Sequence, residues 1–420
     1  MTPMPLTGSA GTEAGAYQLS KWPGSTRHAF ILTLALWFIP MLVVGIIVAL
    51  RPTYRTVTID SYHFSAEQWW AGKSLYTGPR GMNYLPHFAI LFSPFHALPF
   101  WLGEVLWRLL ALVALVWGLW RVVRTVFRDA PERAFFWATL GAMPLCMSAL
   151  RNGNANAHFG AVLLLAIAAI IHSRWWMAAV LIMLLIAVKP LGIVLALLAP
   201  LCYAPLRWRL PVALVGLALF PFLFARPEYV VTQYREAWGN LQACAVVTQH
   251  RFADINGILR TLGVPLTGTA STLTRVLAGG FTALLFWTMA RRLREPLTAL
   301  WLYVLTSGYL MLFNPMTESN SYVILAPAFG LWAAWFLFKQ TGPARRLGWV
   351  LLAMALSMGL LPNVVRPLFG NYFALIWLPL MSILLLVLLG RFLCQSGSPM
   401  DASLSLQPDA GPASVRHSSK

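Results

Sequence analysis

Long apolar segments joined by shorter polar connections make up most of this chain. A helix needs about 20 apolar residues to cross a hydrocarbon core of about 30 Å, and shorter spans are tolerated where helices pack on one another. By this measure the pattern predicts about twelve membrane spans, near residues 29–50, 100–120, 134–150, 155–172, 175–188, 190–205, 210–225, 274–290, 297–313, 321–338, 347–363 and 371–390. The expected fold is an all-α polytopic membrane protein.

The two ends of the chain lack this pattern. Residues 1–28 and 394–420 are rich in Ser, Gly, Pro and Thr and poor in apolar residues, which predicts disordered tails. The first apolar segment is longer than the apolar region of a secretory signal peptide and lacks a small-residue cleavage pattern. We therefore expect that segment to remain as an anchor, and residues 29–393 to form one transmembrane domain.

The positive charges predict an orientation. If the N-terminus is cytoplasmic, thirteen cations fall in the short cytoplasmic connections and three in the short connections on the other side. The cytoplasmic group comprises Arg121, Arg124, Arg128, Arg133, Arg174, Arg207, Arg209, Arg291, Arg292, Arg294, Lys339, Arg345 and Arg346; the other comprises Arg151, Lys189 and Arg366. An excess of Lys and Arg in short loops marks the cytoplasmic side, whereas long loops translocate regardless of charge. Both tails are therefore predicted to be cytoplasmic, and two long loops, near 51–99 and 226–273, to lie outside.

The composition excludes several classes of protein. Apolar residues make up 59% of the chain and charged residues 10%, whereas soluble domains carry about 25% charged residues. This excludes a soluble enzyme and a disordered chain. The 31 cations behind the net charge of +18 do not share one face under this topology, so nucleic acid is not an expected partner. The four cysteines show no C-x-x-C spacing, so neither a disulfide framework nor a thiolate metal site is predicted.

Polar residues are concentrated in five strings on the predicted outer side. The strings lie at residues 55–64, 83–88, 151–158, 188–190 and 314–322. Ionisable groups at membrane depth are costly, about 2.5–3.5 kcal/mol each on insertion scales, and are therefore functional candidates. The five strings together predict one outward-facing site.

Asp60, in the first outer loop, is the candidate general base. The residues after it have the pattern of an amphipathic interfacial helix, with Trp69 and Trp70 expected to face lipid. His63 and Glu67 fall on the same helical face as Asp60, and a solvated face explains them equally well. The alternative for Asp60 is a helix-capping role, which is compatible with catalysis.

A cation and several amides provide candidate substrate contacts. Lys189, followed by a proline at a helix junction, suits a lipid phosphate, and a lysine snorkelling to the interface is the alternative. Arg151 with Asn152, Asn154 and Asn156 offers donors for phosphate oxygens or sugar hydroxyls, and amides also cap helices.

Two carboxylates outside the first loop, Glu318 and Glu104, lead to different predictions. Glu318 has three open roles: binding a hydroxyl pair, pairing with Arg151 or Lys189, and binding a metal. Glu104 and Arg108 are four residues apart in the second span, so we expect a helix-internal ion pair outside the site.

The polar strings, in this order, resemble glycosyltransferase family 87 of the GT-C superfamily, the polyprenyl-phosphate-mannose-dependent α-mannosyltransferases. The likeness extends over most of the membrane region. The family pattern has an aspartate opening the first outer loop, then G-x-x-x-Y, Y-x-P, an apolar stretch between prolines, G-Q-x-N, K-P and a proline-containing outer motif. The matching positions are Asp60, 72–76, Tyr84 to Pro86, 94–99, 153–156, Lys189 with Pro190, and 314–315. The resemblance implies a GT-C-like helix bundle whose large first outer loop carries interfacial helices.

Two departures from the family pattern bear on which sugar the donor carries. Asn154 stands where the family has glutamine. Residues 314–321 stand where the family has S-P-x-S-W-x-H-H, so Asn320 occupies a histidine position.

By resemblance, Asp60 takes the proton from an acceptor hydroxyl as that hydroxyl attacks the anomeric carbon of a polyprenyl-phosphate sugar, with mannose the expected sugar. The expected substrate-binding residues are Lys189, Arg151, Asn154, Asn156, Tyr84, His63, Glu318 and Asn320. The expected partners are the lipid donor, a glycolipid or glycan acceptor and membrane lipid. This scheme requires no cofactor and leaves a divalent metal open. It predicts a bacterial inner-membrane protein whose site faces the periplasm.

Two other functions remain as alternatives. A lipid-linked glycan ligase or polymerase is the nearer one. A secondary transporter shares a large number of spans and a polar interior, but a two-halved transporter usually has a long middle connection. Here the sixth and seventh predicted spans are separated by about four residues.

Overall fold

The computed structural model describes residues 26–51, 58–78, 80–245 and 252–395, with the backbone alone for Ile59 and Asp60. Nearly all of the two predicted tails lies outside these residues. The regular elements of the described chain are all helices. They are α2 (Thr26–Leu50), η1 (Thr58–His63), α3 (Phe64–Trp70), α4 (Pro86–His96), α5 (Phe100–Val126), α6 (Pro131–Asn152), α7 (Ala155–Ile171), α8 (Trp175–Val188), η2 (Pro190–Gly192), α9 (Ile193–Cys202), α10 (Leu206–Leu219), η3 (Phe220–Leu223), α11 (Pro227–Ala245), α12 (Ile255–Thr261), α13 (Gly268–Ala290), α14 (Leu297–Phe313), η4 (Ser319–Ile324), α15 (Ala326–Lys339), α16 (Gly342–Val364), α17 (Arg366–Phe369) and α18 (Tyr372–Gln395).

Eight helical segments of the described chain are long and apolar enough to cross a membrane, so the chain is an integral membrane protein. They are α2, α5, α6, α10 with η3, α13, η4 with α15, α16 and α18. Four shorter apolar segments, α7, α8, η2 with α9, and α14, coincide with other predicted spans. The total of about twelve spans stays a prediction. Several helices begin three to six residues before the predicted spans: α2 at Thr26, α6 at Pro131, α10 at Leu206, α13 at Gly268 and α16 at Gly342.

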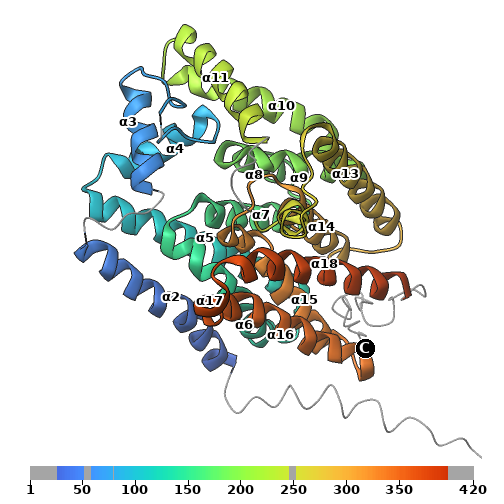
Figure 1. Cartoon of the computed structure of the whole chain (residues 1–420). Helices are drawn as coiled ribbons and strands as arrows, with labels where there is room; N and C mark the ends of the chain where they lie inside the picture. The colour runs from blue at the N-terminus through green and yellow to red at the C-terminus, as the bar shows by residue number, and fades with distance from the viewer. Residues whose placement is uncertain (1–25, 52–57, 79, 246–251, 396–420) are drawn as a thin grey trace, which may run out of the picture.

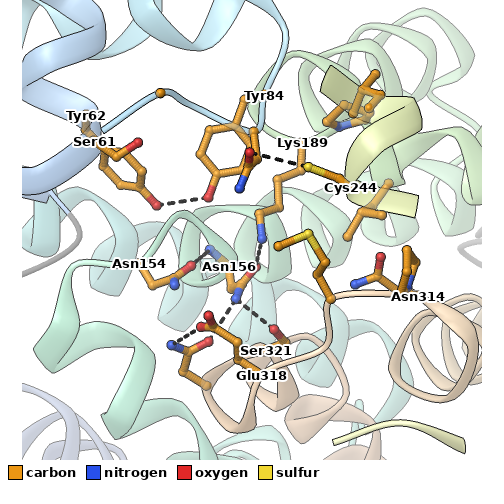
Figure 2. A pocket seen from close by; sticks show the side chains of 18 of the residues that line it. Ser61, Tyr62, Tyr84, Asn154, Asn156, Lys189, Cys244, Asn314, Glu318 and Ser321 are labelled. Atoms are coloured by element: carbon orange, nitrogen blue, oxygen red, sulfur yellow. Dashed lines mark hydrogen bonds between the residues drawn. The ribbon is translucent and has the colours of Figure 1, made fainter. Parts of the chain in front are cut away.

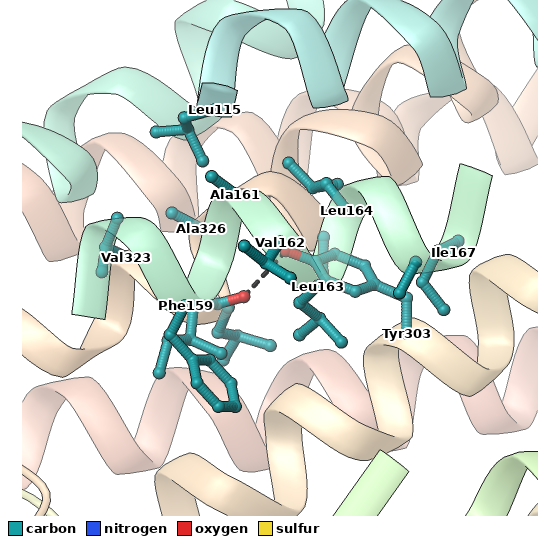
Figure 3. Packing of buried hydrophobic residues seen from close by; sticks show 14 of the residues in the cluster. Leu115, Phe159, Ala161, Val162, Leu163, Leu164, Ile167, Tyr303, Val323 and Ala326 are labelled. Carbon is teal, nitrogen blue, oxygen red and sulfur yellow. Dashed lines mark hydrogen bonds between the residues drawn. The ribbon is translucent and has the colours of Figure 1, made fainter. Parts of the chain in front are cut away.

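Three apolar segments form the interior of the bundle. Almost every residue of α7, α14 and α15 is buried, as expected for helices that are apolar on all sides. Figure 3 shows side chains of α7 packed beside Tyr303 of α14 and Val323 of η4. The Tyr303 hydroxyl donates a 2.7 Å hydrogen bond to the carbonyl oxygen of Ile324, which satisfies two buried polar groups. By contrast, α2 and α13 lie at opposite edges of the bundle (Figure 1) and expose many large apolar side chains.

Glycines allow α6 and α15 to cross at close range. A Cβ atom at Gly141 would lie 2.7 Å from the Cα of Gly330, and a Cβ at Gly330 would overlap the carbonyl oxygen of Ala138. Small residues at such crossings are typical of membrane helices, because lipid supplies no hydrophobic drive and close backbone packing must take its place. This crossing fixes α6, which ends at one of the polar strings, against the buried α15.

Five helices have cations next to one end and a polar string next to the other. In α6, α7, α8, α14 and α15, one end adjoins a connection that holds cations of the predicted cytoplasmic group. The opposite ends adjoin the polar strings at 151–158, 188–190 and 314–322. The polar strings and the main group of cations are therefore at opposite ends of the bundle.

The first long loop differs from the interfacial helix predicted for it. The π-helical turn η1 runs directly into α3, so Asp60 lies inside a helical turn, and the residue that precedes α3 is His63. The capping role considered for Asp60 is therefore wrong. Trp70 is exposed, but Trp69 is only 2% exposed and its ring lies 5.2 Å from that of Tyr229 in α11, so the prediction that both tryptophans face lipid is wrong for Trp69.

The second long loop packs on the first through α11. Oε1 of Gln233 accepts a 3.0 Å hydrogen bond from the backbone N–H of Leu75, and the carboxylate of Glu236 accepts one of 2.6 Å from Ser74. Asn240 donates a 3.0 Å hydrogen bond to the carbonyl oxygen of Met82. In Figure 1, α3, α4 and α11 lie together at one end of the molecule.

Candidate functional site

A cavity of about 690 Å³ lies where the polar strings meet. Each of the five strings contributes residues to its wall, and a sixth segment, the end of α11, adds Leu241, Cys244 and Ala245. The polar lining residues are Ser61, Tyr62, Arg80, Asn83, Tyr84, Asn152, Asn154, Asn156, Lys189, Asn314, Glu318, Asn320 and Ser321. Figure 2 shows many of these side chains turned towards one another across the cavity.

Lys189 owes its position to the proline that follows it. Since Pro190 cannot continue α8, the backbone at Lys189 is extended, and the chain then resumes as η2. The Lys189 ammonium donates a 2.6 Å hydrogen bond to Oδ1 of Asn156 and lies 5.3 Å from the centre of the Tyr84 ring. Burial lowers the pKa of Lys189 to about 8, and the carboxylate of Glu318 acts in the opposite direction.

The turn between α6 and α7 orients two of the asparagines. Gly153 has a positive φ of 66°, as is common where a helix ends, and Asn154 then caps α7 by accepting a 2.9 Å hydrogen bond from the backbone N–H of Asn156. The capping alternative for Asn154 is therefore confirmed, and the same side chain also lines the cavity.

Amides connect the lysine to the carboxylate along one wall of the cavity. Nδ2 of Asn156 donates to Oδ1 of Asn320 at 3.1 Å and to Oγ of Ser321 at 3.0 Å. Nδ2 of Asn320 donates in turn to Oε2 of Glu318 at 3.0 Å. A chain of hydrogen bonds thus runs from Lys189 through Asn156 and Asn320 to Glu318, and it gives the cavity a cationic end and an anionic end.

Two tyrosines of the first long loop also line the cavity. The hydroxyls of Tyr62 and Tyr84 lie 3.2 Å apart, and the Tyr62 oxygen accepts a 3.0 Å hydrogen bond from the backbone N–H of Ala155. Burial is the main cause that raises the pKa of Tyr62 to about 12 and that of Tyr84 well above its usual value. Both hydroxyls therefore stay protonated at neutral pH and cannot act as bases.

Asp60 is the third residue of η1, and the next two residues, Ser61 and Tyr62, line the cavity. Its side chain lies outside the described part of the structure. The assignment of Asp60 as the base stays a prediction.

Two predicted site residues do not line the cavity. Arg151 is exposed, and its carbonyl oxygen accepts a 3.0 Å hydrogen bond from Nε of Arg108. His63 contacts Glu104 at 3.2 Å and His96 at 3.0 Å on the side of η1 that meets α5 and α4. The remaining predicted residues, Tyr84, Asn154, Asn156, Lys189, Glu318 and Asn320, all line the cavity.

Sequence reasoning missed several lining residues. Arg80 lies four residues before Tyr84, and Asn83 opens the polar string at 83–88 but was not named as a substrate contact. The end of α11 gave no signal, since only its packing on the first loop brings Cys244 to within 3.4 Å of Asn83.

The chemistry of the lining suits a phosphate and a polyol. Lys189 supplies a cation for a phosphate, while Glu318 and the asparagines supply acceptors and donors for hydroxyl groups. Within the described residues, no three His, Cys, Asp or Glu side chains come together as a metal site.

Comparisons with known proteins agree with this chemistry. The family model of glycosyltransferase family 87 matches residues 83–315, which is more than half of the chain. The chain is 26% identical over 382 residues to the polyprenol-phosphate-mannose-dependent alpha-(1-2)-phosphatidylinositol pentamannoside mannosyltransferase of Mycolicibacterium smegmatis, covering 84% of this chain and 88% of that protein. No solved structure matches the chain significantly.

Proposed function

Since the chain belongs to glycosyltransferase family 87, we propose that it transfers a sugar, with mannose expected, from a polyprenyl-phosphate donor to a glycolipid or glycan acceptor. The mannosyltransferase of M. smegmatis, named for this donor class, supports the choice of donor. The coarser function, a membrane glycosyltransferase, follows from the family and the apolar helices together.

The observation that carries the proposal is the separation of charge in the cavity. Lys189 lies at one end of the hydrogen-bonded chain and Glu318 at the other. A sugar phosphate has the complementary pattern, since its phosphate needs a cation and its hydroxyls need amides and carboxylates. The phosphate of the donor would bind beside Lys189, with the sugar extending towards Asn320 and Glu318.

The orientation of the protein supports a lipid donor. The cavity lies at the helix ends away from the main group of cations, and such cations mark the cytoplasmic side. The cavity would then face the outside, where nucleotide sugars are absent and a lipid carrier must present the sugar.

The proposed reaction is a single displacement with inversion. Asp60 accepts the proton of the acceptor hydroxyl while the hydroxyl oxygen bonds to the anomeric carbon. The bond between that carbon and the phosphate oxygen breaks at the same time, and polyprenyl phosphate leaves with the electron pair. Lys189 stabilises the departing phosphate. A positioned general base such as Asp60 contributes about 10²–10⁴ in rate.

The test is transfer by the purified protein in lipid nanodiscs. Radiolabelled polyprenyl-phosphate mannose and polyprenyl-phosphate arabinose are supplied separately with a panel of glycolipid acceptors. Labelled guanosine diphosphate mannose and a labelled glycan on a polyprenyl diphosphate serve as the control donors. We expect label to pass from a lipid donor to an acceptor, with inverted anomeric configuration, and none from the nucleotide. Transfer from the nucleotide alone, or transfer only of a whole glycan from a lipid diphosphate, would overturn the proposal.

A further inference from the structure

One buried carboxylate contacts both ends of the turn that carries Asp60. Glu104, in α5, is 1% exposed. Its Oε2 accepts a 2.7 Å hydrogen bond from the hydroxyl of Thr58, the first residue of η1, and its Oε1 lies 3.2 Å from Nε2 of His63, the last residue. Thr58 and His63 are five residues apart, the spacing of hydrogen-bonded residues in a π-helix, so one side of the turn presents both of them to Glu104.

The same helix holds the turn between α6 and α7. Nη1 of Arg108 donates a 2.5 Å hydrogen bond to Oε2 of Glu104, while Nε of Arg108 donates to the carbonyl oxygen of Arg151 at 3.0 Å. Trp107 donates a 2.8 Å hydrogen bond to the carbonyl oxygen of Gly153. One turn of α5 therefore connects two walls of the cavity, the segment that carries Asp60 and the segment that carries Asn154 and Asn156.

The histidine at the end of η1 is held from both sides. An ionised carboxylate only accepts hydrogen bonds, so the Glu104 contact requires a proton on Nε2 of His63. In neutral His63, Nδ1 is then the acceptor for Nδ1–H of His96, 3.0 Å away. The ring orientation of His63 is thus fixed between α5 and α4.

Stability alone does not account for this arrangement. A buried ion pair gains little over apolar residues of similar volume, because both charges lose their hydration. What Glu104 supplies that an apolar residue cannot is a set of directed hydrogen bonds to two residues of one short turn.

We infer that Glu104 is a positioning residue, which holds η1 so that Asp60 meets the acceptor hydroxyl in the geometry of attack. This inference rests on the proposed function, because it takes Asp60 as the base. The expected ion pair between Glu104 and Arg108 is confirmed, and its carboxylate also contacts η1.

The kinetic test uses Glu104→Gln and Thr58→Val. Misplacing a reacting group by about 1 Å costs about 10²-fold in rate, so we expect kcat to fall about 10- to 100-fold in Glu104→Gln and less in Thr58→Val. The KM for the donor should stay unchanged, because Lys189 and Asn156 are held by a hydrogen bond to each other and by the bonds of Asn156 to Asn320 and Ser321. The matched control is Glu295→Gln, which changes a carboxylate that binds Tyr203 outside the cavity. Unchanged kcat in Glu104→Gln and Thr58→Val, or a rise in donor KM without loss of kcat, would overturn the inference.

Two further measurements separate positioning from folding. In Glu104→Gln/Arg108→Met the uncompensated guanidinium is gone, so thermal stability should return while kcat stays below that of Arg108→Met alone, the control for the lost contact with Arg151. Equal kcat in these two variants would overturn the inference. Amide hydrogen exchange over residues 58–63 should become faster in Glu104→Gln than in Glu295→Gln. Unchanged exchange would contradict the inference that Glu104 holds η1. Exchange needs no substrate. If the wild-type protein transfers no sugar while exchange rises as expected, the proposed function has failed and the structural role of Glu104 stands.

Discussion

Nζ of Lys189 donates a 2.6 Å hydrogen bond to Oδ1 of Asn156, 33 residues earlier in the chain. This bond commits the amide oxygen of Asn156 to the lysine and directs its nitrogen to Asn320 and Ser321. The bond thereby joins the junction after α8 to the start of α7, and both segments line the cavity, with Lys189 as the cation.

Replacing Lys189 with methionine should weaken binding of the donor. A hydrogen bond to a charged group contributes about 1.5–3 kcal/mol, so we expect the donor KM to rise about 10- to 100-fold. The control is Lys73→Met, since Lys73 is exposed on the first loop and outside the cavity lining. Equal donor KM values for the two variants would exclude a phosphate contact at Lys189.

The lowered pKa of Lys189 predicts a pH dependence of donor use. Below its pKa of about 8 the ammonium is charged and attracts the phosphate; as the pH rises through this value, the charge is lost. We therefore expect kcat/KM for the donor to fall above a pH of about 8. Because arginine stays charged throughout this range, Lys189→Arg should abolish that fall, and a fall that persists in Lys189→Arg would assign it to another group.

Glu318 should act on the sugar rather than on the phosphate. Replacing it with glutamine removes the anionic end of the cavity, and we expect the KM for polyprenyl-phosphate mannose to rise about tenfold, the loss of roughly one hydrogen bond to a charged group. Inhibition by polyprenyl phosphate without a sugar should not change. Glu228→Gln, at the start of α11 and away from the cavity lining, is the control. Equal losses for both ligands would show that Glu318 acts through Lys189.

The close crossing of α6 and α15 predicts a stability effect. Gly330→Ala forces a methyl group into the backbone of α6, and overpacking of this kind costs about 1–3 kcal/mol. In Gly216→Ala, on α10, the added methyl meets no atom within 4 Å, so this variant should unfold at or above the wild-type temperature. Thermal unfolding in detergent compares the two, and equal midpoints would show that the crossing can relax.

The helical architecture could be predicted from sequence because the relevant signal is local. Each apolar segment near the predicted spans is a helix, and the polar strings mark their ends. Tyr84, Asn154, Asn156, Lys189, Glu318 and Asn320 were found for the same reason, since costly groups in an apolar chain stand out individually.

What the sequence could not give depends on contacts between distant segments. The burial of Trp69 follows from α11, which lies more than 150 residues later, and the pattern of the first loop alone predicted lipid exposure. The contacts of Glu104 with Thr58 and His63 could not be predicted, because they form only once the first loop has folded onto α5. The separation of four residues along one helix already explained its contact with Arg108.

Asp60→Asn tests the central claim most directly, with donor affinity and turnover measured on one preparation. The account predicts that transfer from polyprenyl-phosphate mannose falls by about 10²–10⁴, because the base is lost, while the dissociation constant of the donor stays unchanged. An asparagine variant with wild-type turnover, or one that loses donor binding and turnover together, would contradict it.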